Sequence, residues 1–74
     1  MTNVEKLKKV GMLASVRQRL GARSATDNSY DEQINKASNS DLVALYSAWY
    51  LGTEDWWYDL KWKFDQLNEL DQNQ

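Results

Sequence analysis

The chain has 74 residues, carries a net charge of −2, and contains no cysteine, histidine or proline. A chain of this length is expected to form one small domain, near the lower limit of what a single hydrophobic core can stabilise. Without Cys and His it lacks disulfide bonds, the usual zinc ligands, and the side chains that most often act as nucleophile or general base, so we expect no metal, no cofactor and no catalysis.

The hydropathy pattern indicates a soluble protein. The longest nearly apolar run, from Leu42 to Leu51, is about half the length of a membrane span. No apolar segment of the signal-peptide type follows the first residues. We therefore expect a cytoplasmic protein that does not cross a membrane, and the absence of cysteine agrees with a reducing compartment.

The first predicted element is a helix over residues 3–20, within a basic segment 1–21. Thr2 and Glu5 have the Ser/Thr-x-x-Glu spacing of a capping box, and Gly21 suits a C-terminal cap. Gly11 lies where the apolar stripe shifts, so a kink is expected there. The apolar positions of this helix form two stripes, one of Leu7, Val10 and Ala14 and one of Leu13, Val16 and Leu20.

The second predicted helix is short and follows an irregular connection. Residues 22–29 combine Gly-, Ser- and Asn-type loop composition and are expected to form the most mobile loop. Ser29 and Glu32 again have capping-box spacing, which predicts a helix over 30–37. Its apolar stripe consists only of Tyr30, Ile34 and Ala37.

Two aromatic-rich helices are predicted over residues 40–51 and 54–70, followed by a polar tail at 71–74. Ser38 or Ser40 can cap the first of them. Only Gly52 and Thr53 separate the two, which predicts an αα-hairpin. Their predicted buried faces are Leu42, Leu45, Tyr46 and Trp49 on the first, and Trp57, Leu60, Phe64 and Leu67 on the second. The fold class is therefore all-α, a small bundle of three main helices and one short helix.

A second aromatic stripe lies opposite the predicted core face of the last helix. At about 100° per residue, Tyr58 and Trp62 point away from that face, and Asp65 and Glu69 continue the same side. Tyr50 lies similarly to one side of the preceding helix. The rings can be core, covered by the first helix through Leu13, Val16 and Leu20; they can be an exposed interface; or they can line a partly covered groove for a small ligand.

An interface is the interpretation that gives a function. Trp and Tyr are favoured at interface hot spots, and neighbouring carboxylates favour a basic partner. We therefore expect a non-enzymatic protein-protein interaction or regulatory module that presents an aromatic and acidic helical surface to another protein or to a second copy of itself as a homodimer.

Nucleic-acid binding by the basic first helix is the alternative. Residues 1–25 have a net charge of +5 and residues 26–74 a net charge of −7. Lys6, Lys9 and Arg17 lie on roughly one side of a helix and can contact phosphates. The acidic remainder of the chain repels a polyanion, which favours an ordinary solvated helix face. The same segment has no Trp or Phe to anchor it on a lipid surface, so a membrane-surface role has little support.

Overall fold

The computed structural model describes residues 1–47 and 56–72, and the side chain of residue 56 is not described. Within these ranges the chain is helical and contains no strand, which confirms the all-α expectation. The helices are α1 (Asn3–Lys9), α2 (Leu13–Leu20), α3 (Asp31–Lys36), α4 (Asn39–Ser47) and α5 (Trp56–Gln72).

The single helix predicted over 3–20 is in fact two helices. Gly11 adopts a left-handed conformation with a φ of +75°, which ends α1 rather than merely bending it. The Met12 backbone N–H donates to the Leu7 carbonyl at 2.9 Å, so the chain turns back over the end of α1. This turn buries the Met12 side chain completely, whereas Ala14, expected in an apolar stripe, is exposed.

Three of the predicted helix boundaries depend on their expected caps. Thr2 and Glu5 form the capping box of α1. Gly21 ends α2 with a φ of +112°. The Ser38 hydroxyl accepts a hydrogen bond from the Asp41 N–H at 3.1 Å at the start of α4.

The capping box expected at α3 is not formed. Tyr30 occupies the N-cap of this helix and makes no side-chain capping bond. Ser29 instead donates its backbone N–H to Asp27 at 3.0 Å, and Asp27 also accepts from the Arg23 N–H at 2.8 Å. The loop over 22–29 is thus organised around one carboxylate.

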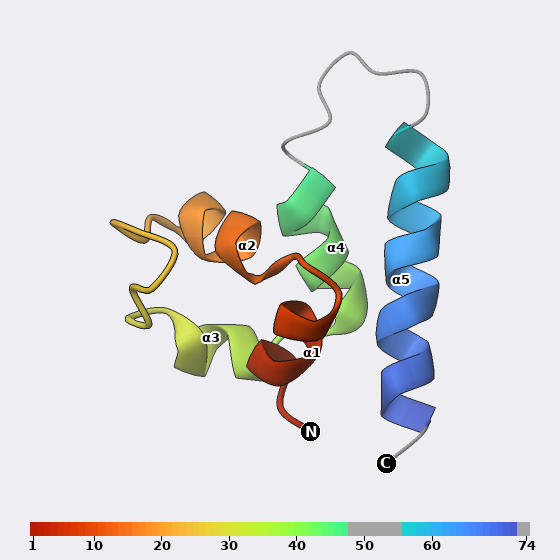
Figure 1. Ribbon diagram of the computed structural model, residues 1–74, viewed down its shortest axis with the longest axis horizontal. Coiled ribbons are helices and arrows are strands. Elements are labelled where there is room, and N and C mark those ends of the chain that lie inside the picture. The colour runs from red at the N-terminus through yellow and green to blue at the C-terminus, as the bar shows by residue number, and fades with distance from the viewer. Residues whose placement is uncertain (48–55, 73–74) are drawn as a thin grey trace.

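The hydrophobic core is formed where α1, α2, α3, α4 and α5 converge. Six side chains are almost completely buried there: Leu7, Met12, Val16, Ile34, Leu42 and Leu67. Helix α4 occupies the middle of the molecule, between α2 and α3 on one side and α5 on the other (Figure 1). The molecule measures 33 × 31 × 16 Å, so it is a thin slab.

Helix α5 packs along α4 at one edge of this slab, with a smaller contact to α1 (Figure 1). Leu60 and Leu67 are buried, and Phe64 is half-buried, as their stripe predicts. The turn of the expected hairpin, as well as Trp49 and Tyr50, lies outside the described residues. Helix α5 continues to Gln72, so the first two residues of the expected tail are helical.

Candidate protein interface

The outward side of α5 carries four side chains in one line. Tyr58, Trp62, Asp65 and Glu69 follow one another at spacings of four, three and four residues, which keeps them on one side of a helix. Tyr58 is 70% exposed and Trp62 is 58% exposed, and both carboxylates are exposed. We call these four residues the ring-acid face. Tyr50, the fifth sequence-predicted interface residue, lies outside the described residues.

The exposed rings exclude one of the three arrangements expected from the sequence. If Leu13, Val16 and Leu20 covered Tyr58 and Trp62, both rings would be buried. Helix α2, which carries those three residues, packs on α4 rather than on the outward side of α5 (Figure 1). The rings therefore do not belong to the core of a single chain.

Trp57 was expected in the core and is instead 53% exposed. Its ring meets the Tyr58 ring edge to face, with centroids 5.2 Å apart and an interplanar angle of 87°. Such pairs fix ring orientation as well as bury area. The exposed aromatic surface of α5 is therefore wider than the ring-acid face alone.

A shallow, mainly apolar groove lies beside Trp57, between α4 and α5. It has a volume of about 410 Å³ and is lined by Ser40, Val43, Trp57, Leu60, Lys61 and Phe64. Tyr58 and Trp62 are not among its walls. The groove is thus separate from the ring-acid face, and it does not support the small-ligand arrangement considered for those two rings.

Two lysines of α5 accompany the ring-acid face. Lys61 Nζ lies 3.2 Å from Asp65 Oδ2, one helical turn away. Lys63 Nζ lies 5.3 Å from the centroid of the Trp62 ring, within the range of a cation-π interaction. Lys63 Nζ also donates to the Val10 carbonyl at 2.7 Å, which links this indole to the C-terminal end of α1.

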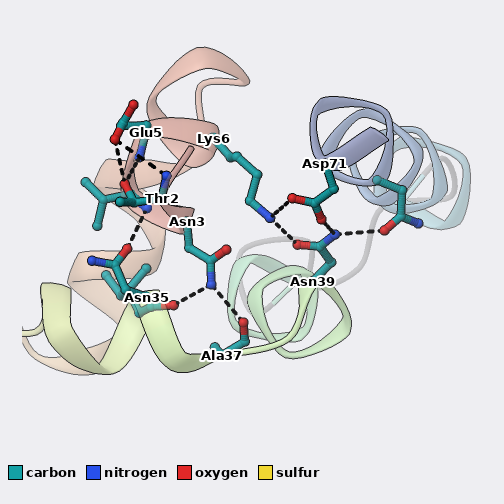
Figure 2. A network of polar contacts seen from close by, with 11 residues as sticks. Thr2, Asn3, Glu5, Lys6, Asn35, Ala37, Asn39 and Asp71 are labelled. Atoms are coloured by element: carbon teal, nitrogen blue, oxygen red, sulfur yellow. Dashed lines mark hydrogen bonds and ion pairs between the residues drawn. The ribbon is translucent and has the colours of Figure 1, made fainter. Parts of the chain in front are cut away.

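The opposite side of α5 is held by a partly buried polar network (Figure 2). Lys6 is 3% exposed, and its Nζ donates to Asp71 Oδ1 at 2.8 Å and to Asn39 Oδ1 at 2.9 Å. The Asn39 amide donates in turn to Asp71 Oδ2 at 2.8 Å and to Asn68 Oδ1 at 2.7 Å. Helices α1, α4 and α5 meet in this network.

The charge of Asp71 is stabilised by these partners. Hydrogen bonds from Lys6 and Asn39 lower the pKa of the Asp71 carboxyl below its ordinary value. Sequence reasoning assigned Asp71 to a polar tail and Lys6 to a solvated face. The only signal that pointed to such a pair was the opposite charge of the two halves of the chain.

Two of the three expected nucleic-acid contacts are engaged within the chain. Lys6 is buried in the network just described. Arg17 forms a bidentate ion pair with Asp31, with distances of 3.0 Å from Nε to Oδ1 and 2.6 Å from Nη2 to Oδ2. Arg17 Nη1 also donates to the Ala25 carbonyl at 2.7 Å. The hydrogen bond to Asp31 raises the pKa of Arg17. Lys9 is exposed. Lys9 is thus the only exposed residue of these three.

No family model, curated protein or solved structure matches this chain. Among the described residues, no group of three or more carboxylates is arranged to hold a metal ion. None of the helices in the described ranges has both the length and the apolar character needed to span a bilayer.

Proposed function

We propose that this chain is a non-enzymatic protein-protein interaction module and that the ring-acid face binds a protein partner. The observation that carries this proposal is the exposure of Tyr58 and Trp62, at 70% and 58%, on a helix whose other side is buried. An exposed group of large rings on a small protein is typical of an interaction site. The αα-hairpin that we infer for α4 and α5 would hold this face in a fixed position.

The two rings and the two carboxylates of the face suit different parts of a partner surface. Trp62 and Tyr58 supply large area with few rotatable bonds, so they suit an apolar depression on the partner. Asp65 and Glu69 extend the same line and suit basic side chains, which they attract over a distance of about a Debye length, roughly 8–10 Å. The partner surface therefore combines an apolar centre with donors or cations at one side.

The rings supply most of the binding energy in this proposal. Truncation of a hot-spot Trp costs about 2–4 kcal/mol, whereas removal of an exposed charge changes mainly the association rate and its salt dependence. A regulatory role suits such a module, since it acts by occupying or bringing together other proteins. Its composition is our reason for placing it in the cytoplasm.

Affinity capture from a lysate of the source cells tests the proposal. The wild-type chain is compared with a Tyr58→Ser/Trp62→Ser double variant and with Arg19→Ala, an exposed substitution on α2 at the other side of the molecule (Figure 1). We expect a partner retained by the wild type and by Arg19→Ala but lost from the double variant. The retained protein is then purified and titrated directly against all three chains.

Circular dichroism is the control for folding in each variant. Equal retention of every bound protein by the folded double variant would exclude the ring-acid face as the binding site. Direct titration with a dissociation constant unchanged by the double substitution would have the same meaning.

A further inference from the structure

We infer that the partner of the ring-acid face is a second copy of this chain, paired through antiparallel α5 helices. This inference rests on the proposed function, because it assigns a partner to the same face. It starts from the spacing of four, three and four residues among Tyr58, Trp62, Asp65 and Glu69. That spacing reads the same in both directions along the helix.

When one of two copies of α5 is reversed, each of the four positions of the face therefore lies opposite another of these positions. When two copies of α5 run in opposite directions about a twofold axis midway between Trp62 and Asp65, Tyr58 lies opposite Glu69 of the second copy. Trp62 lies opposite Asp65 in the same way. Both rings of the face in one chain then meet carboxylates of the other, and both chains use the same four residues, as a closed twofold interface requires.

The chemistry of the opposed pairs is complementary. The Tyr58 hydroxyl and the Trp62 indole N–H are hydrogen-bond donors, and ionised carboxylates only accept. Within residues 1–47 and 56–72, neither ring donor has a hydrogen-bond partner in the single chain. Hydrogen bonds to ionised acceptors are the stronger class. Antiparallel pairing thus gives both donors an acceptor.

Parallel pairing does not give this complementarity. It would place Asp65 opposite Asp65 and Glu69 opposite Glu69, and like charges directly opposite each other are unfavourable. Lys61, which lies 3.2 Å from Asp65, offsets one carboxylate per chain. Charge therefore selects the antiparallel orientation.

The shape of the molecule allows the pairing. Helix α5 runs along an edge of the slab, and its 17 residues give an accessible length of about 25 Å (Figure 1). One helix against one helix buries an area at or below the lower end of specific interfaces, about 1,200 Å² in total. We therefore expect a weak dimer, with a dissociation constant on the order of 10–100 µM.

Sedimentation velocity between about 5 µM and 1 mM tests the self-association, over a range chosen around the expected affinity. The wild type is expected to shift from monomer to dimer. Trp62→Ala is expected to weaken the dimer at least tenfold. Arg19→Ala changes an exposed side chain on α2, away from α5, and is expected to retain the dimer within about threefold.

A distance measurement tests the orientation. The chain has no cysteine, so Gln72→Cys provides a single attachment site for a nitroxide label at the exposed end of α5. Antiparallel pairing about the stated axis separates the two labels by roughly 25–30 Å, from 1.5 Å per residue and a helix separation of 8–10 Å. Parallel pairing brings them within about 15 Å. All four residues of the ring-acid face stay unchanged in this variant.

The outcomes separate this inference from the proposed function. A wild type that remains monomeric at 1 mM overturns the inference, and so does a dimer with a short label distance or one that Arg19→Ala weakens as much as Trp62→Ala does. If another protein is nevertheless lost from the Tyr58→Ser/Trp62→Ser variant, the proposed function stands with a different partner. If neither self-association nor partner loss is found, both are excluded.

Discussion

Lys6 and Asp71, which lie 65 positions apart in the chain, form an ion pair of 2.8 Å between Nζ and Oδ1. The side chain of Lys6 is 4% exposed and that of Asp71 is 46% exposed, so the pair lies at the margin of the core. It joins α1 to the last turn of α5 (Figure 2). Because only the lysine is shielded from water, the charge of Lys6 depends on its counter-ion more than the charge of Asp71 does.

This asymmetry predicts different effects for the two substitutions. Asp71→Asn leaves a buried ammonium group without its counter-ion and is expected to lower the urea midpoint of unfolding clearly. Lys6→Met replaces the cation with an apolar side chain of similar length, and its free energy of unfolding is expected to lie within about 1 kcal/mol of the wild type. Equilibrium urea unfolding at pH 7 measures both. Equal losses for the two variants would contradict this account.

The same pair predicts the acid response of the fold. The pKa of Asp71 is lowered in the folded chain, so its contribution to stability is present above the ordinary pKa of an aspartate, about 3.9, and is lost as the pH falls through the lower folded value. Asp27 acts in the same direction, since hydrogen bonds from Ser29 and Arg23 lower its pKa to about 2. The thermal unfolding midpoint is expected to decrease as the pH is lowered from about 4 to about 2.

The control for this pH dependence is Asp71→Asn combined with Asp27→Asn. Neither amide titrates, so the slope of stability against pH is expected to be shallower in the double variant than in the wild type across that window. Thermal unfolding at half-unit pH steps gives the comparison. Parallel curves for the two proteins would assign the acid response to other carboxylates.

Replacing Gly11 or Gly21 with alanine is expected to lower stability by different amounts. Gly11 and Gly21 both have positive φ, at 75° and 112°. A Cβ at Gly21 would lie 3.0 Å from the Tyr30 hydroxyl, whereas one at Gly11 meets no atom within 4 Å. Gly11→Ala is expected to cost about 1 kcal/mol from backbone strain alone, and Gly21→Ala about 2 kcal/mol. Gly11→Asn is the control, because Asn tolerates this conformation better than Ala does.

Substitutions on the two sides of α5 are expected to change stability by different amounts. Leu67 is completely buried, so Leu67→Ala is expected to cost about 2–5 kcal/mol. Trp62→Ser removes a larger side chain but is expected to change the free energy of unfolding by no more than about 0.5–1 kcal/mol, since the ring is 58% exposed. Urea unfolding at low protein concentration, where self-association is absent, makes the comparison. A large loss in Trp62→Ser would place that ring in the core.

Local signals predicted most of the helices. The capping box at Thr2 and Glu5 and the glycine after α2 act over three to four residues, so the sequence shows them directly. The same reasoning treated Gly11 as a kink. A glycine within a helical pattern can bend a helix or end it, and the outcome here depends on the burial of Met12, which is a tertiary contact.

Periodicity identified the ring-acid face but misassigned Trp57. The angle between side chains on a helix separates Tyr58 and Trp62 from Leu60 without any knowledge of the neighbouring helices. It cannot say how wide the buried strip is. Leu60 and Leu67 are buried, whereas Trp57 is 53% exposed. The Lys6–Asp71 pair was equally beyond periodicity, because its partners come from opposite ends of the chain.

Lys63 gives the outer rings a connection to the interior. One ammonium group lies over the Trp62 indole and donates to the carbonyl that closes α1. Enclosing the indole in a complex removes water from that cation and strengthens its attraction to the ring. Lys63 therefore connects the turn between α1 and α2 to the outer surface of α5. Binding of a partner at that surface would also stabilise this turn.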